Sequence, residues 1–141
     1  MARLLVLLQF AAIATVLFPA GRPGALRTGV LIALAGVAWV GWAVLFNHWG
    51  NFNIRPEPRS GACLITDGPY RWVRHPMYLG SLVIGIGACV AGPQVWRFAA
   101  WVVLAGVLIA KARREERGLL AQFPGYDSYR RGRAFLIPGV W

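Results

Sequence analysis

Long apolar runs alternate with polar stretches along most of this chain. The runs cover about residues 4–20, 28–46, 76–92 and 95–110, and each approaches the roughly 20 residues with which a helix crosses a bilayer. The pattern predicts an all-α integral membrane protein with about four transmembrane helices in a single domain, residues 1–141. Pro93 separates the last two runs. We therefore expect a helical hairpin whose second arm continues past Ala110, with a re-entrant pair as the alternative.

Two long polar segments accompany these runs. Residues 47–75 are too long for a simple connector and carry prolines and glycines that break regular structure. Residues 111–141 form a tail that begins as an amphipathic helix. One face of that helix holds Ile109, Ala112, Glu116, Leu119, Leu120 and Phe123.

Glu116 falls on this apolar face, where a buried carboxylate needs a partner. Arg74 is a candidate for that partner. The neighbouring Glu115 is expected to point toward Lys111, four positions earlier on the helix. The alternative is a solvated helix that lies on the membrane surface.

Composition and charge support the membrane assignment. The chain is 57% hydrophobic and only 14% charged, with a formal net charge of +10. In the four-span arrangement twelve of the 15 basic residues share one side, and only Arg22, Arg27 and Arg97 lie on the other. The positive-inside rule then places both termini in the cytoplasm, at a bacterial inner membrane or an endomembrane.

This charge is explained by topology and by attraction to anionic lipid headgroups, so it requires no nucleic acid. A signal peptide is the alternative interpretation of residues 4–20. Cys63 and Cys89 are the only cysteines, and His48 and His75 are the only histidines. We expect no metal site and no disulfide.

Small residues recur in the second and third apolar runs. Ser81, Gly85, Ala88 and Gly92 fall on one helical face, and the second run contains Gly29, Ala33, Gly36 and Gly41. Such stripes allow helix backbones to approach closely. They predict a tight bundle whose ligand site lies at its cytoplasmic mouth or in a groove open to lipid.

The segment from Thr66 to Gly80 carries the candidate chemistry, because it places Arg74, His75 and Tyr78 where a polar loop becomes an apolar helix. Pro76 suits the first helical position. His75 would then lie beside free backbone N–H groups and the positive end of the helix dipole, where anions bind.

Two motifs together resemble a known enzyme family. They are G-P-Y-R-x-V-R-H-P-x-Y-x-G from Gly68, and E-E-x-x-L-x-x-x-F-x-x-Y-x-x-Y from Glu115 followed by Leu-Ile-Pro. In this order, across residues 64–138, they resemble the isoprenylcysteine carboxyl methyltransferase and phospholipid methyltransferase superfamily.

The resemblance implies a membrane enzyme that binds S-adenosylmethionine at the cytoplasmic surface and methylates a lipophilic substrate from the bilayer. Its expected partners are that substrate and membrane lipids, with no obligate protein partner. Within the two motifs we assign cofactor binding to Tyr70, Arg74, His75, Tyr78, Gly80, Glu115, Glu116 and Tyr126. Catalytic roles are assigned to Arg74, Glu116, Tyr129 and Arg133.

The chain departs from the family pattern near its end, where Phe135 stands at the usual arginine position and Arg133 is a candidate replacement. The acceptor therefore stays open between a carboxylate, which needs no base, and an amine, for which His75 or Tyr129 can help remove a proton. The alternatives are a phospholipid or small-metabolite N-methyltransferase, and a sterol-reductase-like enzyme that binds NADPH through Arg130, Arg131 and Arg133. The last alternative is a membrane scaffold with no catalytic activity.

Overall fold

The structure, a computed structural model, describes residues 2–17, 23–47 and 63–139. Every regular element in these ranges is helical, as the sequence predicts. The four long helices are α1 (Ala2–Leu17), α2 (Pro23–Phe46), α3 (Pro76–Ala91) and α4 (Val95–Gln122). A 3₁₀ turn, η2 (Gly68–Arg71), precedes α3, and the short helix α5 (Tyr126–Arg131) follows α4.

The helices follow the apolar runs, with two extensions: α2 begins at Pro23 rather than near residue 28, and α4 continues past Ala110. The hairpin is confirmed, because α3 ends at Ala91, α4 begins at Val95 and Pro93 lies between them. The second arm continues well past Ala110 to Gln122. The added segment is rich in Ala, Arg, Glu and Leu, which favour helix, and Pro124 follows its end. Most of the predicted loop, residues 48–62, lies outside the described residues.

Two of the helices are long and apolar enough to cross a membrane, namely α2 over Ala25–Phe46 and α4 over Val95–Gln122. The apolar stretches of α1 (Leu4–Ala14) and α3 are shorter. Large apolar side chains remain exposed on α1, α2 and α4, among them Leu7, Leu31, Leu45 and Val102. An exposed apolar surface of this extent is typical of helices that face lipid. The four-span count and the cytoplasmic termini stay predictions.

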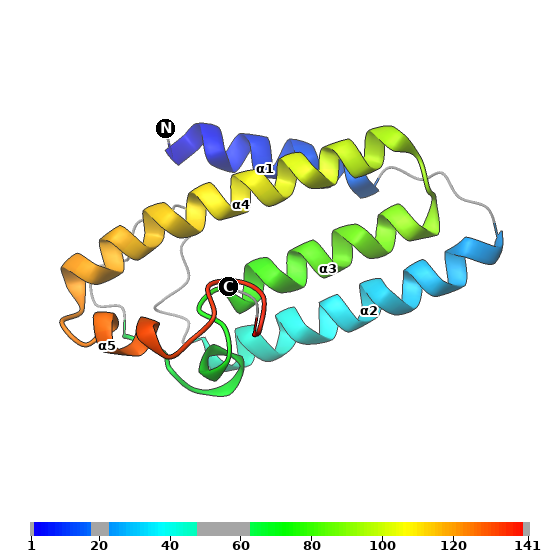
Figure 1. The fold of residues 1–141 in the computed structure, drawn as a ribbon. Coiled ribbons are helices and arrows are strands. Elements are labelled where there is room, and N and C mark those ends of the chain that lie inside the picture. The colour runs from blue at the N-terminus through cyan, green and yellow to red at the C-terminus, as the bar shows by residue number, and fades with distance from the viewer. Residues whose placement is uncertain (1, 18–22, 48–62, 140–141) are drawn as a thin grey trace.

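The four long helices run side by side, and η2, α5 and the C-terminal segment gather at one end of them (Figure 1). Helix α1 packs against α4, α2 against α3, and α3 against α4. A buried cluster between α1, α3, α4 and the tail includes Ala12, Leu82, Leu104, Leu108 and Phe135. The tail is therefore part of the core, because Phe135 is only 4% exposed.

Small residues bring α2 and α3 into backbone contact. A Cβ added at Gly87 would lie 2.6 Å from the backbone nitrogen of Ala33, and one added at Gly29 would lie 2.4 Å from the carbonyl oxygen of Gly87. The tight contact that the sequence predicts is confirmed, but its position on α3 differs from the predicted stripe. Gly85 faces α4 instead, where a Cβ would lie 2.7 Å from Trp101.

Trp101 helps to turn the Gly85 face of α3 toward α4 rather than α2. Its indole Nε1 donates a hydrogen bond of 2.9 Å to the carbonyl of Leu82. At the other end of the hairpin, Arg97 is only 3% exposed and donates a hydrogen bond of 2.9 Å to the carbonyl of Ala88. Arg97 thereby satisfies a carbonyl in the last turn of α3, a role that basic side chains often have near helix C-termini.

Candidate functional site

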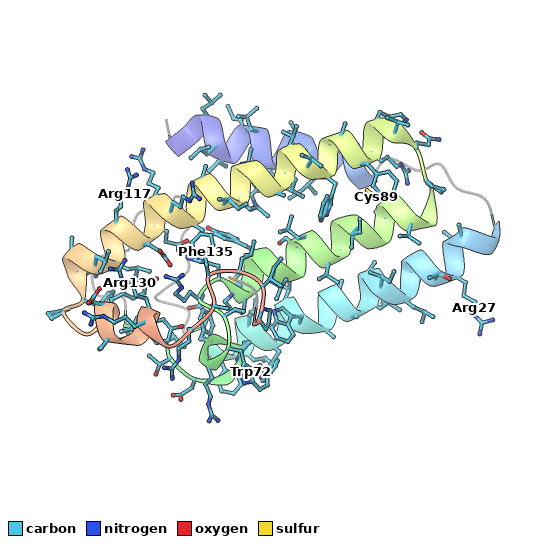
Figure 2. The ribbon with its side chains drawn as sticks, viewed as in Figure 1. Arg27, Trp72, Cys89, Arg117, Arg130 and Phe135 are labelled. Carbon is cyan, nitrogen blue, oxygen red and sulfur yellow. The ribbon has the colours of Figure 1, made fainter. Side chains whose placement is uncertain are left out.

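Most of the predicted site residues gather where η2, the start of α3, the end of α4 and α5 converge. Trp72, Arg130 and Phe135 mark this end of the molecule in Figure 2. Backbone hydrogen bonds hold the tail beside the first motif. The N–H of Ala134 donates to the carbonyl of Trp72 at 3.1 Å, and the N–H of Arg74 donates to the carbonyl of Ala134 at 3.0 Å. This short parallel bridge between Val73 and Ala134 fixes the two segments next to each other.

Local sequence explains why the first motif adopts this shape. Gly68 has a φ of +58°, a left-handed conformation that favours glycine. A Cβ there would also lie 2.5 Å from the ring of Phe46. Pro76 is the first residue of α3, and the carbonyl of His75 accepts the first helical hydrogen bonds, from Tyr78 and Leu79 at 3.1 Å each. The helix start therefore fixes the position of the His75 side chain.

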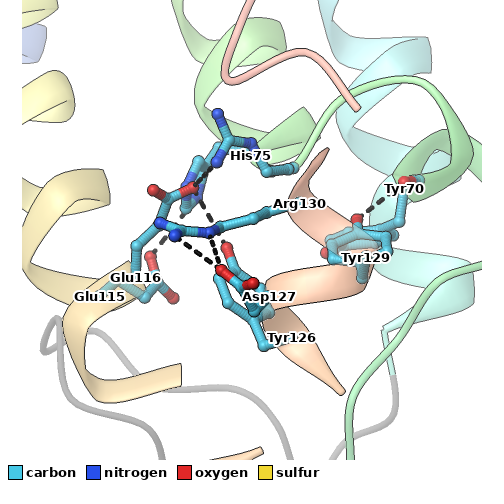
Figure 3. A network of polar contacts seen from close by, with 9 residues as sticks. Tyr70, His75, Glu115, Glu116, Tyr126, Asp127, Tyr129 and Arg130 are labelled. Carbon is cyan, nitrogen blue, oxygen red and sulfur yellow. Dashed lines mark hydrogen bonds and ion pairs between the residues drawn. The ribbon is translucent and has the colours of Figure 1, made fainter. Parts of the chain in front are cut away.

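Glu116 lies at the centre of the polar network (Figure 3). Its Oε1 lies 2.8 Å from Nη1 of Arg74 and 3.3 Å from Nε2 of His75. The hydroxyl of Tyr126 donates to the same oxygen at 3.1 Å. Only 13% of the Glu116 side chain is exposed, and 14% of the Arg74 side chain. The predicted pairing of Glu116 with Arg74 is thus confirmed.

Glu115 approaches the same histidine from its other nitrogen. Its Oε2 accepts a hydrogen bond of 3.0 Å from the hydroxyl of Tyr78 and lies 3.8 Å from Nδ1 of His75. The rings of His75 and Tyr78 stack with centroids 5.5 Å apart. The buried imidazole is therefore flanked by two carboxylates, one at each ring nitrogen.

Lys111 lies beside Tyr78 and joins α1 to the site. Its Nζ lies 5.6 Å from the centroid of the Tyr78 ring and donates a hydrogen bond of 2.6 Å to the side chain of Gln9. The sequence predicts that Glu115 points toward Lys111, and it does not predict the contact of Lys111 with Gln9. A lone amide within the first apolar run was the available signal for this contact.

Both tyrosines of α5 donate hydrogen bonds, and Tyr70 of η2 contributes a backbone carbonyl as an acceptor. Burial, followed by the charge of Glu116, raises the pKa of Tyr126, and burial followed by the charge of Glu115 raises that of Tyr70. Burial also raises the pKa of Tyr129 to about 12. The hydroxyl of Tyr129 donates to the carbonyl of Tyr70 at 2.8 Å. These phenols stay protonated near neutral pH, which argues against Tyr129 as a proton acceptor.

Arg133 and Phe135 occupy different places in the site. The Arg133 guanidinium lies 5.5 Å from the centroid of the Tyr129 ring. Phe135 lies against the network itself, with its ring centroid 5.2 Å from that of His75 and 5.2 Å from the guanidinium carbon of Arg74. Phe135 therefore lies against Arg74 and His75, whereas Arg133 lies beside Tyr129, and the catalytic role of Arg133 stays a prediction.

Gly80 stands apart from the polar network. A Cβ at this position would lie 2.4 Å from Val40 and 3.1 Å from the carbonyl oxygen of Gly36. Helix packing between α2 and α3 therefore accounts for this glycine. Among the described residues, no group of three His, Cys, Asp or Glu side chains is placed to hold a metal ion.

The fold and the site together define a helical protein with membrane-length apolar helices and a buried network of paired cations and carboxylates at one end. Residues 29–121 match the isoprenylcysteine carboxyl methyltransferase family, and the chain belongs to that family. The matched range includes Arg74, His75 and Glu116 and ends before Tyr126.

Three curated relatives are 30–32% identical to this chain over the regions that align. A protein named methanethiol S-methyltransferase from Mycobacterium tuberculosis is 30% identical over 85% of this chain and 50% of its own length. Methanethiol S-methyltransferase 2 from Bradyrhizobium diazoefficiens is 32% identical over 77% of this chain and 46% of its own. The cobalt-zinc-cadmium resistance protein CzcN from Cupriavidus metallidurans is 30% identical over 89% of this chain and 58% of its own.

The chain thus spans about half the length of the curated relatives it matches. No solved structure matches it.

Proposed function

We propose that this protein transfers a methyl group from S-adenosylmethionine to a lipophilic acceptor that partitions into the membrane. Membership of the isoprenylcysteine carboxyl methyltransferase family and the names of two relatives support methyl transfer. We further propose that the four long helices all span the membrane, with both termini on the cytoplasmic side.

The observation that carries this proposal is the meeting of Arg74 and His75 with Glu115 and Glu116 in one buried cluster. The amino-acid part of S-adenosylmethionine carries a carboxylate and an ammonium group. A site for it needs a cation and a carboxylate a few ångströms apart, and this cluster has both. The N-terminus of α3 adds a further preference for the ligand carboxylate.

The residues present fit such a ligand. Arg74 offers a planar fork of donors suited to a carboxylate. Glu115 is the more accessible of the two acids, with 32% of its side chain exposed, so it is the better placed to receive an incoming ammonium. Tyr78 stands between Glu115 and Lys111 and offers an aromatic face beside the charged groups.

Bound S-adenosylmethionine supplies an electrophilic methyl group on a positively charged sulfur. The protein's task is then to align that methyl group with the acceptor and to exclude water, which requires few acid–base groups. Phe135, buried against Arg74 and His75, excludes water from one side of the network. His75 is the residue best placed to accept a proton, because Tyr126 and Tyr129 are held protonated.

The proposed acceptor is of the isoprenylcysteine carboxyl O-methyltransferase type, and an apolar thiol is the second candidate. Two relatives are named for methanethiol, and the apolar ring of Phe135 replaces a cation that would otherwise attract an acceptor carboxylate. An amine acceptor, as in phospholipid N-methylation, would need His75 as its base. Family membership supports these methyl acceptors over the reductase and scaffold alternatives.

Membranes that contain the protein, incubated with methyl-labelled S-adenosylmethionine and each acceptor class in turn, test the proposal. The expected result is label in a lipid-extractable product or a volatile thioether, and none with Glu116→Ala. Purified protein should also gain thermal stability with S-adenosylmethionine. Stabilisation by NADPH alone would favour the reductase alternative, and stabilisation by neither ligand would contradict the proposal.

A further inference from the structure

A second charged feature lies beside the proposed methyl-donor site. An open pocket of about 490 Å³ is lined by Arg71, Trp72, Arg131, Arg133, Ala134 and Gly139, among others. It contains none of the residues that bind Glu116. The pocket spans the seam between the first motif and the tail, since the backbone hydrogen bond from Ala134 to Trp72 joins two of its wall residues.

The pocket is strongly basic. Of its three arginines, Arg131 pairs with the carboxylate of Asp127, which also binds Arg130. No described acidic residue forms an ion pair with Arg71 or Arg133. The Nε of Arg133 is buried and lacks a hydrogen-bond partner, and such a group gains from an incoming acceptor. Arginine forks suit the oxygens of a phosphate group in particular.

The pocket also lies at the end of a membrane-length helix. Trp72 is 55% exposed, and its ring stacks on Trp39 with centroids 6.3 Å apart and lies edge-on to Trp42 at 5.4 Å. Both partners belong to the last turns of α2, whose candidate span ends at Phe46. Exposed tryptophans at the end of a span are typical of the headgroup layer of a bilayer.

From these contacts we infer that the pocket binds the phosphate group of an anionic membrane phospholipid. Arg71 and Arg133 supply the uncompensated charge, and Trp72 places the phosphate at headgroup depth, with the acyl chains free to lie along α2. Inorganic phosphate has the same binding chemistry but no acyl chains. A bound phospholipid bridges Arg71 on one side of the seam and Arg133 on the other, so it also holds the tail against the first motif.

Quenching of tryptophan fluorescence by brominated lipids tests this inference on the full chain in neutral detergent. We expect brominated phosphatidylglycerol to quench at about tenfold lower concentration than brominated phosphatidylcholine, and millimolar inorganic phosphate not to displace it. Arg71→Gln should weaken the binding of phosphatidylglycerol about three- to fivefold, as the loss of one surface ion pair does.

Arg117→Gln is the matched control, because it removes the same charge from α4 at the same end of the molecule but outside the pocket. Arg71 is exposed, so its substitution tests the pocket without disturbing the core. Hydrogen exchange gives an independent measurement, since bound phosphatidylglycerol should slow exchange at the amides of Arg74 and Ala134.

Three results would overturn the inference. Equal quenching by the two lipids would show that the headgroup is not recognised. Equal effects of Arg71→Gln and Arg117→Gln would show that only overall charge matters. Displacement of phosphatidylglycerol by millimolar phosphate would assign the pocket to a soluble anion instead.

Discussion

Arg74 and Glu116 approach to 2.8 Å although all of α3 and most of α4 separate them in the sequence. The carboxylate also accepts hydrogen bonds from Tyr126 and contacts His75. One acidic side chain thus joins the first motif, α4 and α5. The network depends on Glu116 more than on any other single side chain.

Replacing His75 or Glu116 by Ala is expected to abolish binding of S-adenosylmethionine. The first change removes the imidazole at the start of α3, and the second removes the carboxylate that positions Arg74. Isothermal titration calorimetry on the purified protein measures the affinity. Unchanged affinity in both variants would contradict the assignment of the site.

Glu116→Gln is expected to lower the free energy of unfolding by about 1–2 kcal/mol, because the largely buried guanidinium of Arg74 loses its charged partner. Thermal unfolding in detergent, followed by circular dichroism, gives the change. Asp127→Asn is the control, since that carboxylate is solvated and its loss should have little effect. A double-mutant cycle with Arg74→Met should show coupling between the two sites.

Tyr126→Phe removes only the hydroxyl that donates to Glu116. We expect a loss of about 1 kcal/mol in stability, the usual contribution of one such hydrogen bond. Ser128→Ala provides the comparison, because its hydroxyl makes an exposed bond within α5. Equal melting temperatures for the two variants would mean that the Tyr126 hydroxyl does not support the network.

Gly87→Ala is expected to destabilise the fold by at least about 1–3 kcal/mol, because the new methyl group would lie 2.6 Å from the backbone of α2. Gly106→Ala on α4 is the matched control. No atom lies within 4 Å of a Cβ at that position, and alanine favours helix over glycine by about 1 kcal/mol. The control should therefore match or exceed the parent in thermal stability, whereas a neutral Gly87→Ala would contradict the close packing of α2 and α3.

The raised pKa of Tyr129 predicts a loss of stability at high pH. In the folded protein this phenol ionises at about 12 rather than near 10. Its contribution is fully present below pH 10 and is lost as the pH rises from 10 toward 12. Unfolding measured across this range should show a shallower loss for Tyr129→Phe, and identical slopes would contradict the predicted shift.

The sequence predicts the helices well because their signals are local. Apolar runs and Pro93 give the hairpin, and Gly68 and Pro76 give the turn before α3. The family motifs alone assign Arg74, His75 and Glu116 to one site. The position of Glu116 on an apolar helical face independently required a partner, which the structure provides.

The contacts that the sequence does not predict depend on how each helix is rotated about its axis and on how distant segments pack. The face of α3 that meets α2 is set by Trp101, which takes the position beside Gly85. Likewise, the contact of Lys111 with Gln9 arises because α1 packs on α4. The placement of Phe135 against His75 depends on the bridge that carries the tail back to the first motif.

The bridge between Val73 and Ala134 has a consequence for biosynthesis. A ribosome makes the Val73 side of it early and the Ala134 side only after the complete hairpin of α3 and α4. All the long helices can therefore be in place before the cluster around Glu116 closes. Until Ala134 and Phe135 emerge, Arg74 has no Phe135 over its guanidinium, so a nascent chain stalled before Ala134 is expected to be inserted but inactive.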